Sequence, residues 1–263
     1  MGEKNKSMSQ IEKISNNLVK AFLNDKIINS IPLKYTKNIK EANKLRKLCE
    51  SKIKKPIIGF KAGGTGIKLL KKLKEKEPFY ATVYKKNLLS SGKKVKINKY
   101  TLGIELEVCY LIKKNILNSK IKITNTNIGR FITHVAPCIE VVGYRQRKKG
   151  IKYLGDLCSD FGANVKFLIG QKSKYKIIKK FNLDTFISNT KINQFVKGNT
   201  NTVYINPLNS CRFVINKLKK DKIISNKNFY VFTGSTVGVV PIKGKGIYSA
   251  KINHIGSVKV KIT

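Results

Sequence analysis

The stretch that decides the fold covers residues 102–112 and reads Leu102-Gly103-Ile104-Glu105-Leu106-Glu107-Val108-Cys109-Tyr110-Leu111-Ile112. Apolar side chains alternate with charged ones in its first half, and large apolar and aromatic residues dominate the rest. Because successive side chains of a β-strand point to opposite faces of a sheet, the pattern predicts a strand with one face in the core. Ile104, Leu106 and Val108 are expected on the core face. Glu105 and Glu107 are expected together on the opposite face.

Glu105 and Glu107 stand out because acidic residues are scarce in this chain. The 263 residues include 55 Lys and Arg against 14 Asp and Glu, which gives a formal charge of +41. Two carboxylates about 7 Å apart on one strand face repel each other unless a cation bridges them or one is protonated. Lysines stop at Tyr100 and resume at Lys113, so the pair forms an acidic island. The alternative is a solvent-facing pair, but the island favours a divalent-cation site.

Glu140 is a candidate third ligand, because it lies between Ile139 and Val141 in a second apolar stretch. A buried glutamate is unfavourable unless it is paired or bound to a metal. Its alternative partner is a lysine or Arg145. Three carboxylates with open coordination positions suit Mg²⁺ or Mn²⁺, which prefer oxygen ligands.

The positive charge is spread along the chain rather than gathered in one block. Only five of the 55 basic residues are arginine, the side chain that nucleic-acid-binding proteins favour for bidentate and stacking contacts. Lys, Ile and Asn are abundant instead. Their codons are rich in A and T, so a genome biased toward A and T produces this composition whatever the protein binds. We therefore interpret the charge as a solvated surface with non-specific attraction to polyanions. A basic nucleic-acid-binding protein is the less favoured alternative.

Cysteine usage and apolar patterning indicate a cytoplasmic protein without a membrane partner. The five cysteines are widely scattered and form no Cys-x-x-Cys pair. With only two histidines, His134 and His254, a zinc site is not predicted, and the thiols are expected to be reduced. No apolar stretch is long enough to span a membrane, and the start of the chain leads into no signal-peptide core.

The periodicity predicts a helical N-terminal part, residues 1–55, joined to a β-rich catalytic core, residues 56–263, in a single α+β domain. Helices are expected at residues 8–30, at residues 38–53, over about ten residues from Ile67, and from a cap at Asn206 and Pro207 to Leu218. β-Rich segments are expected at residues 56–61, 104–113, 131–143, 229–233 and 255–262.

Eight short motifs follow one another in a fixed order through the β-rich part. They occupy residues 59–63, 105–108, 137–145, 156–160, 167–170, 206–209, 232–235 and 255–260. Their sequence and spacing resemble the 2-keto-4-pentenoate hydratase/4-oxalocrotonate decarboxylase family of the fumarylacetoacetate hydrolase superfamily. The resemblance implies a mixed β-roll core with flanking helices, like the C-terminal domain of fumarylacetoacetate hydrolase. It also implies a homo-oligomer, alone or in a complex with a related chain.

The resemblance further implies Mg²⁺ or Mn²⁺ held by Glu105, Glu107 and Glu140, the same residues that the strand pattern singles out. Lys61, at the end of an apolar strand before a glycine-rich loop, matches the family's catalytic lysine near the substrate carboxylate. The residues that would contact a small 2-oxo acid substrate are Lys61, Leu106, Arg145, Asp160 and Thr233.

The implied reaction is that of a lyase acting on an unsaturated 2-oxo acid through an enolate. A 2-keto-4-pentenoate-type hydratase is the first interpretation, and a 4-oxalocrotonate-type decarboxylase is the alternative. Phe79 stands where the family often has an aspartate of the acid–base machinery, and Phe161 where it has asparagine. These departures leave room for a second alternative, a non-catalytic relative that serves as an assembly subunit.

Overall fold

The computed structural model describes residues 8–176 and 182–263. The first seven residues, where the sequence predicts no signal peptide, lie outside the described part. The helices are α1 (Gln10–Asn24), α2 (Ile39–Lys52), α3 (Ile67–Lys72), α4 (Leu154–Cys158) and α5 (Pro207–Lys220). The strands are β1 (Ile57–Gly63), β2 (Phe79–Tyr84), β3 (Leu88–Ser90), β4 (Lys94–Val95), β5 (Thr101–Ile112), β6 (Ile132–Gly143), β7 (Asn164–Ile169), β8 (Ser173–Lys174), β9 (Asp184–Asn189), β10 (Gln194–Asn199), β11 (Phe229–Ser235), β12 (Gly246–Ile252) and β13 (Gly256–Ile262).

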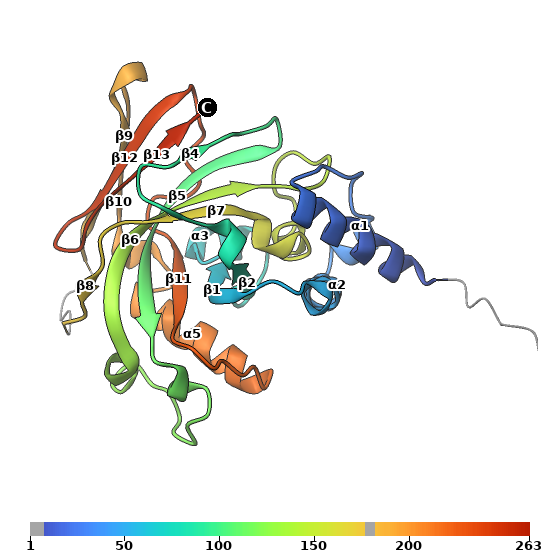
Figure 1. Ribbon diagram of the computed structural model, residues 1–263, viewed down its shortest axis with the longest axis horizontal. Helices are drawn as coiled ribbons and strands as arrows, with labels where there is room; N and C mark the ends of the chain where they lie inside the picture. Colours follow the sequence, from blue (N-terminus) through green and yellow to red (C-terminus); the bar gives the residue numbers. More distant parts are fainter. Residues whose placement is uncertain (1–7, 177–181) are drawn as a thin grey trace, which may run out of the picture.

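The strands form two sheets. The larger has the order β2-β1-β11-β5-β6-β7-β3, with β8 added beside β6, and the smaller has the order β10-β9-β12-β13-β4. The larger sheet is mixed, because β1 runs parallel to β11 and β3 runs parallel to β7, whereas the other pairs along its order are antiparallel. Figure 1 shows the larger sheet curling through the middle of the molecule, with the smaller sheet at one end. The predicted α+β class is confirmed.

The long strands β5 and β6 form the centre of the larger sheet, and their alternation places the core. Ile104, Leu106 and Val108 are buried in the main hydrophobic cluster, as the pattern of β5 predicts. Antiparallel pairing sets Leu106 opposite Ile139 and Glu105 opposite Glu140. One face of the strand pair therefore belongs to the core, and the other carries the carboxylates.

The helices cover separate regions of the sheet. Figure 1 shows α1 and α2 together on one side of the molecule and α5 beneath β11. Asn206 caps α5 by accepting the N–H of Asn209 at 2.8 Å, and Pro207 is its first residue, as predicted. Asn38 caps α2 in the same way, through the N–H of Lys40. A short polar side chain at these positions satisfies an N–H group that has no partner within the helix.

Two predicted helices are shorter than the periodicity suggests. The helix expected over residues 8–30 ends at Asn24, because Asp25 adopts a left-handed conformation with φ +52°. The helix expected over ten residues from Ile67 ends after six, at Lys72, and Lys74 is again left-handed with φ +56°. Both ends follow from a local backbone reversal, which apolar periodicity does not record.

Each predicted β-rich segment contains a strand, but the structure also has strands that were not predicted. The strands outside the predicted segments are β2, β3, β4, β7, β8, β9, β10 and β12. All five cysteines are free and buried, in agreement with the reduced thiols expected. Within the described part of the chain, every helix is too short or too polar to cross a membrane.

Candidate metal centre and cavity

Three glutamates meet on facing positions of β5 and β6. Glu105 is directly opposite Glu140, and Glu107 lies two residues further along β5 on the same face. One carboxylate oxygen of each residue lies within 4.8 Å of those of the other two. Glu107 and Glu140 are fully buried, whereas Glu105 is partly exposed. All three predicted metal ligands are therefore brought together by the strand register.

Two oxygens of this cluster, Glu107 Oε1 and Glu140 Oε2, are buried and accept no hydrogen bond from the described residues. The other Glu107 oxygen, Oε2, accepts the backbone N–H of Gly234 at 3.0 Å. Buried polar atoms without partners are rare, because burial removes the water that would otherwise bind them. Carboxylate oxygens are the ligands that Mg²⁺ and Mn²⁺ prefer. The donor set therefore fits a divalent cation held by Glu105, Glu107 and Glu140.

The same crowding changes the protonation of the cluster. Burial, and after it the charge of Glu140, raises the pKa of the Glu105 carboxyl to about 7. The same two causes raise the pKa of Glu107 well above its usual value, and the Lys61 ammonium opposes the shift of both. Carboxylates this close do not all ionise at neutral pH without a compensating charge. A bound cation would supply that charge and release the protons.

The effect of Mg²⁺ on stability is therefore expected to grow with pH. Because the pKa of Glu105 is higher in the folded chain than the usual 4.5, its contribution to stability is present below about pH 4.5 and is lost as the pH rises through 7. Mg²⁺ at about 10 mM is expected to raise the melting temperature more at about pH 8 than at about pH 5.5. Thermal denaturation with Mg²⁺ or EDTA measures this, and equal shifts at both pH values would contradict it.

Lys61 lies near the end of β1 beside the cluster and is 3% exposed. Its Nζ is 2.5 Å from Glu140 Oε1 and also donates to the carbonyl oxygen of Gly162 at 3.1 Å. Burial lowers the pKa of the ammonium, but the charges of Glu140, Glu105 and Glu107 raise it above its usual value. Lys61 therefore stays charged. An ammonium has three N–H donors, and two of those of Lys61 have acceptors among the described residues.

Left-handed backbone before β7 presents the Gly162 carbonyl to Lys61. The φ angle is +52° at Phe161, +72° at Gly162 and +55° at Ala163. For the two residues with side chains, this conformation costs about 1–3 kcal/mol each, which the surrounding packing has to offset. A Cβ on Gly162 would lie 2.9 Å from the Cβ of Ala81, so the site has no room for a side chain there.

The two phenylalanines that depart from the family motifs fill space near the site. Phe79 is 3% exposed, and its ring occupies the position into which a side chain on Gly63 would project. Phe161 packs on Phe22 of α1, with 4.8 Å between the ring centroids. Neither phenylalanine side chain can donate or accept a proton, so neither can take part in acid–base catalysis.

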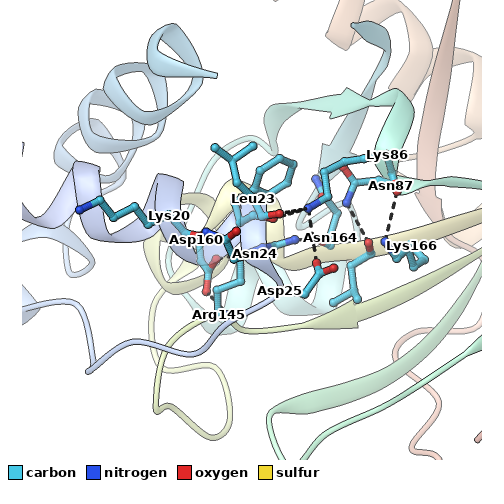
Figure 2. Close-up of polar contacts among 12 residues, drawn as sticks. Lys20, Leu23, Asn24, Asp25, Lys86, Asn87, Arg145, Asp160, Asn164 and Lys166 are labelled. Carbon is cyan, nitrogen blue, oxygen red and sulfur yellow. Dashed lines mark hydrogen bonds and ion pairs between the residues drawn. The ribbon is translucent and has the colours of Figure 1, made fainter. Parts of the chain in front are cut away.

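Arg145 and Asp160, which the resemblance implies as substrate contacts, pair with each other. Arg145 Nη1 is 3.3 Å from Asp160 Oδ1, and the Arg145 backbone N–H donates to Asp160 Oδ2 at 2.6 Å. The guanidinium also donates to the carbonyl of Asn164 and lies 5.0 Å from the ring centroid of Phe22. Figure 2 shows the pair beside the end of α1. These contacts join α1 to the core.

Breaking this pair by removing the Asp160 charge is expected to lower stability without changing metal binding. The substitution Asp160→Asn leaves the Arg145 guanidinium buried without its counter-charge, which costs about 3–5 kcal/mol. Urea denaturation is expected to show that loss, while the Mg²⁺ affinity measured by calorimetry stays within about twofold. The opposite result, an unchanged stability with a weakened affinity for oxalate in the presence of Mg²⁺, would favour the substrate-binding role that the motifs imply.

Leu106 and Thr233 also make internal contacts. The Leu106 side chain is in the core, and its carbonyl accepts hydrogen bonds from the N–H and the hydroxyl of Thr236 at 2.8 and 2.9 Å. The Thr233 hydroxyl is buried and donates to the carbonyl of Val108 at 2.9 Å. Their role in binding substrate stays a prediction, as does that of Arg145 and Asp160.

A cavity of about 550 Å³ opens beside Lys61 and Glu105. Its wall is built from residues 61–69, residues 234–239 and parts of the segment 197–202, with contributions from β6 and from the region around α4. Among the described residues that line it, the titratable side chains are Lys61, Lys68, Glu105 and Lys197. Leu106, Arg145, Asp160 and Thr233 are not among these lining residues.

Two backbone groups of the site were not predicted from the sequence. The N–H of Gly234 binds Glu107, and the carbonyl of Gly162 binds Lys61. Gly234 has φ +98°, and a Cβ there would collide with the Thr65 side chain. A glycine directly after a predicted strand is the signal that was available, since it marks a close approach or a positive φ.

Comparison with solved structures identifies the fold. Two structures of 4-oxalocrotonate decarboxylase from Pseudomonas putida G7, one with magnesium and adipate and one with calcium and acetate, match at TM-scores of 0.82 and 0.80. Each is 17% identical in sequence, and each match covers 98% of this chain and 100% of that one. A structure from Yersinia pestis CO92 described as a fumarylacetoacetate hydrolase family protein matches at a TM-score of 0.55, with 14% identity over 79% of this chain and 94% of that one.

Comparison of the amino-acid sequence with known families and curated proteins finds no match. At 17% identity a structural match shows the fold alone, and this match extends over nearly the whole of both chains. The chain therefore has the fold of 4-oxalocrotonate decarboxylase and of the fumarylacetoacetate hydrolase superfamily, the fold that its motifs predict.

Proposed function

We propose that the chain is a divalent-metal-dependent lyase that acts on an unsaturated 2-oxo acid. The observation that carries the proposal is the cluster of three glutamates beside a charged lysine, next to a largely apolar cavity that Lys61 and Glu105 line. Two buried oxygens of the cluster accept no hydrogen bond from the described residues. The shared fold supports the proposal, because the 4-oxalocrotonate decarboxylase structure was solved with magnesium and a dicarboxylate.

Each residue of the site has its own task in this proposal. Glu105, Glu107 and Glu140 would hold Mg²⁺ or Mn²⁺, which when bound polarises the 2-oxo group and stabilises the negative charge that develops on its oxygen. The Lys61 ammonium is placed to bind the substrate carboxylate by a charge-assisted hydrogen bond. The Gly162 carbonyl keeps that ammonium in position.

Decarboxylation is the reaction that the cavity favours. In this reaction the bond to the leaving carboxylate breaks, its electron pair moves through the conjugated carbons to the 2-oxo oxygen, and CO₂ departs. The resulting enolate then takes a proton on carbon, which the Lys61 ammonium can supply and regain from water. Among the common groups for activating water, His, Asp, Cys and Tyr are absent from the described residues that line the cavity, and the one glutamate there, Glu105, is assigned to the cation.

Hydration of an unsaturated 2-oxo acid, the reaction that the motifs place first, is the second candidate. The hydroxyl groups of Thr65, Thr202 and Ser235 line the cavity and offer hydrogen bonds to a water molecule. Both reactions require the same cation and the same contacts to the acid head group. The choice between decarboxylation and hydration therefore depends on which groups of the cavity contact the rest of the substrate or a water molecule.

The proposal is tested by turnover of the purified chain. With Mg²⁺ the chain is expected to consume 4-oxalocrotonate, followed by its absorbance, and to release CO₂. 2-Hydroxypenta-2,4-dienoate is offered separately as the hydratase substrate. If neither compound is consumed faster than by the Glu107→Gln variant, the lyase proposal is wrong and the non-catalytic assembly subunit is favoured. The homo-oligomer, a related partner chain and the cytoplasmic location remain predictions.

A further inference from the structure

We propose that the substrate of this site carries a sizeable uncharged hydrocarbon group in addition to its 2-oxo acid head and, for decarboxylation, to the second carboxylate that leaves as CO₂. This inference rests on the proposed function for the head group, and on the cavity itself for the hydrocarbon group. The cavity of about 550 Å³ falls in the range of about 300–1,000 Å³ that takes drug-sized molecules. A five-carbon 2-oxo acid would leave most of it filled with water.

The cavity has Lys61 and Glu105 at one end, and most of the surface that lines it is apolar. Lys61 and Glu105 mark the polar end, where the metal cluster lies. The large apolar side chains of the rest of the wall are Ile67, Leu69, Val142, Ile151, Leu157, Val237 and Val239, and its polar side chains are Thr65, Lys68, Lys197, Asn201, Thr202, Ser235 and Thr236. A ligand that fills such a space matches it when its head is charged and its body is not.

Two of these apolar side chains are exposed at the mouth of the cavity. Ile67 is 38% exposed, and Val239 is 36% exposed. They belong to two different walls, since Ile67 begins α3 and Val239 follows β11. An apolar group lying between them would remove both from water, and such burial is favourable in proportion to the area covered.

Two lysines in the wall, Lys68 and Lys197, raise the question of whether the distal group is charged. Lys197 Nζ is 3.3 Å from Asp184 Oδ2 and 5.9 Å from the Phe186 ring centroid, so it already has partners. Lys68 is exposed to water. Ion pairs between exposed groups contribute little, because water and salt screen them. The apolar wall therefore outweighs the two lysines in selecting the distal group.

The test compares three 2-oxo acids by calorimetry with the Mg²⁺-loaded chain. They are pyruvate, 2-oxooctanoate and 2-oxosuberate, which supply the head alone, the head with an apolar tail, and the head with a tail of the same length ending in carboxylate. We expect 2-oxooctanoate to bind about 100-fold more tightly than pyruvate and more tightly than 2-oxosuberate. The inference is overturned by equal affinities for 2-oxooctanoate and pyruvate, or by tightest binding of 2-oxosuberate.

A pair of variants separates the apolar wall from general effects. Ile67→Ser with Val239→Ser is expected to weaken 2-oxooctanoate about tenfold and pyruvate far less. The matched control is Ile224→Ser with Ile247→Ser, two isoleucines that are 75% and 53% exposed and lie outside the cavity wall. This control is expected to change neither affinity. An equal effect of both pairs would contradict the inference.

A probe without the 2-oxo group keeps this inference distinct from the proposed function. Octanoate is added to the chain without metal, and its binding is followed by ligand-observed NMR. Binding that the Ile67→Ser, Val239→Ser pair weakens supports the apolar site even if Mg²⁺ and pyruvate fail to bind, a failure that would contradict the proposed function alone. Octanoate that does not bind, or that binds the variant equally well, overturns the inference.

Discussion

Replacing Glu107 by glutamine is expected to reduce kcat/KM by about 10³-fold or more and to abolish measurable Mg²⁺ binding. Glu107 is fully buried, and one of its oxygens is held by the Gly234 N–H while the other accepts no hydrogen bond from the described residues. An amide at this position removes a charged ligand from the cluster. A metal stabilises the developing charge by several kcal/mol, and each 1.4 kcal/mol corresponds to a factor of ten in rate.

The same substitution is expected to leave the folded state at least as stable without metal. It removes one of three crowded carboxylates, and the pKa of Glu107 is already raised by burial and by Glu140. Urea denaturation in EDTA at about pH 8 measures this. Glu41→Gln is the matched control, because Glu41 is a partly exposed residue of α2 that pairs with Lys44. A Glu107→Gln variant that keeps Mg²⁺ binding, or that unfolds, would contradict the metal assignment.

Replacing Lys61 by methionine is expected to lower both stability and turnover. The Glu140 carboxylate would lose an ammonium at 2.5 Å while remaining fully buried. Removing one partner of a buried ion pair costs about 3–5 kcal/mol. Turnover is expected to fall about 10²–10⁴-fold, because the substrate carboxylate loses its cation and the enolate loses its proton donor. Mg²⁺ is expected to restore part of the stability but not the turnover.

A double variant separates the two roles of Lys61. Lys61→Met with Glu140→Gln removes both buried charges, and their loss together is expected to be nearly neutral for stability, as urea denaturation would show. Turnover is expected to stay lost, because the double variant lacks both the lysine and a metal ligand. A Lys61→Met enzyme with unchanged kcat and KM would show that Lys61 only balances the charge of Glu140.

The centre of the fold was predictable because one physical signal governs it. Strict alternation over residues 102–108 sets one face of β5 in the core and the other toward the site, and the apolar stretch around Glu140 becomes its partner strand β6. The three carboxylates could be grouped from the amino-acid sequence because acidic residues are scarce in this chain. The ends of α1 and α3 were not predictable, because left-handed residues such as Asp25 and Lys74 leave no mark on apolar periodicity.

The parts of the site made by the backbone could not be read from residue types. The N–H of Gly234 and the carbonyl of Gly162 reach the cluster only because the chain bends there, with φ values of +98° and +72°. Conversely, Arg145 and Asp160 stand in motifs of the family, yet they bind each other beside α1. A motif places a residue in the chain, but only the fold decides which way its side chain turns.

The measurement that tests the metal centre most directly is anomalous scattering from crystals of the chain soaked with Mn²⁺ and oxalate. The account predicts one strong peak with carboxylate oxygens of Glu105, Glu107 and Glu140 within about 2.5 Å, and with oxalate on its open side toward the cavity. A peak elsewhere on the protein, with the three carboxylates left without a metal and Lys61 still bound to Glu140, would contradict it.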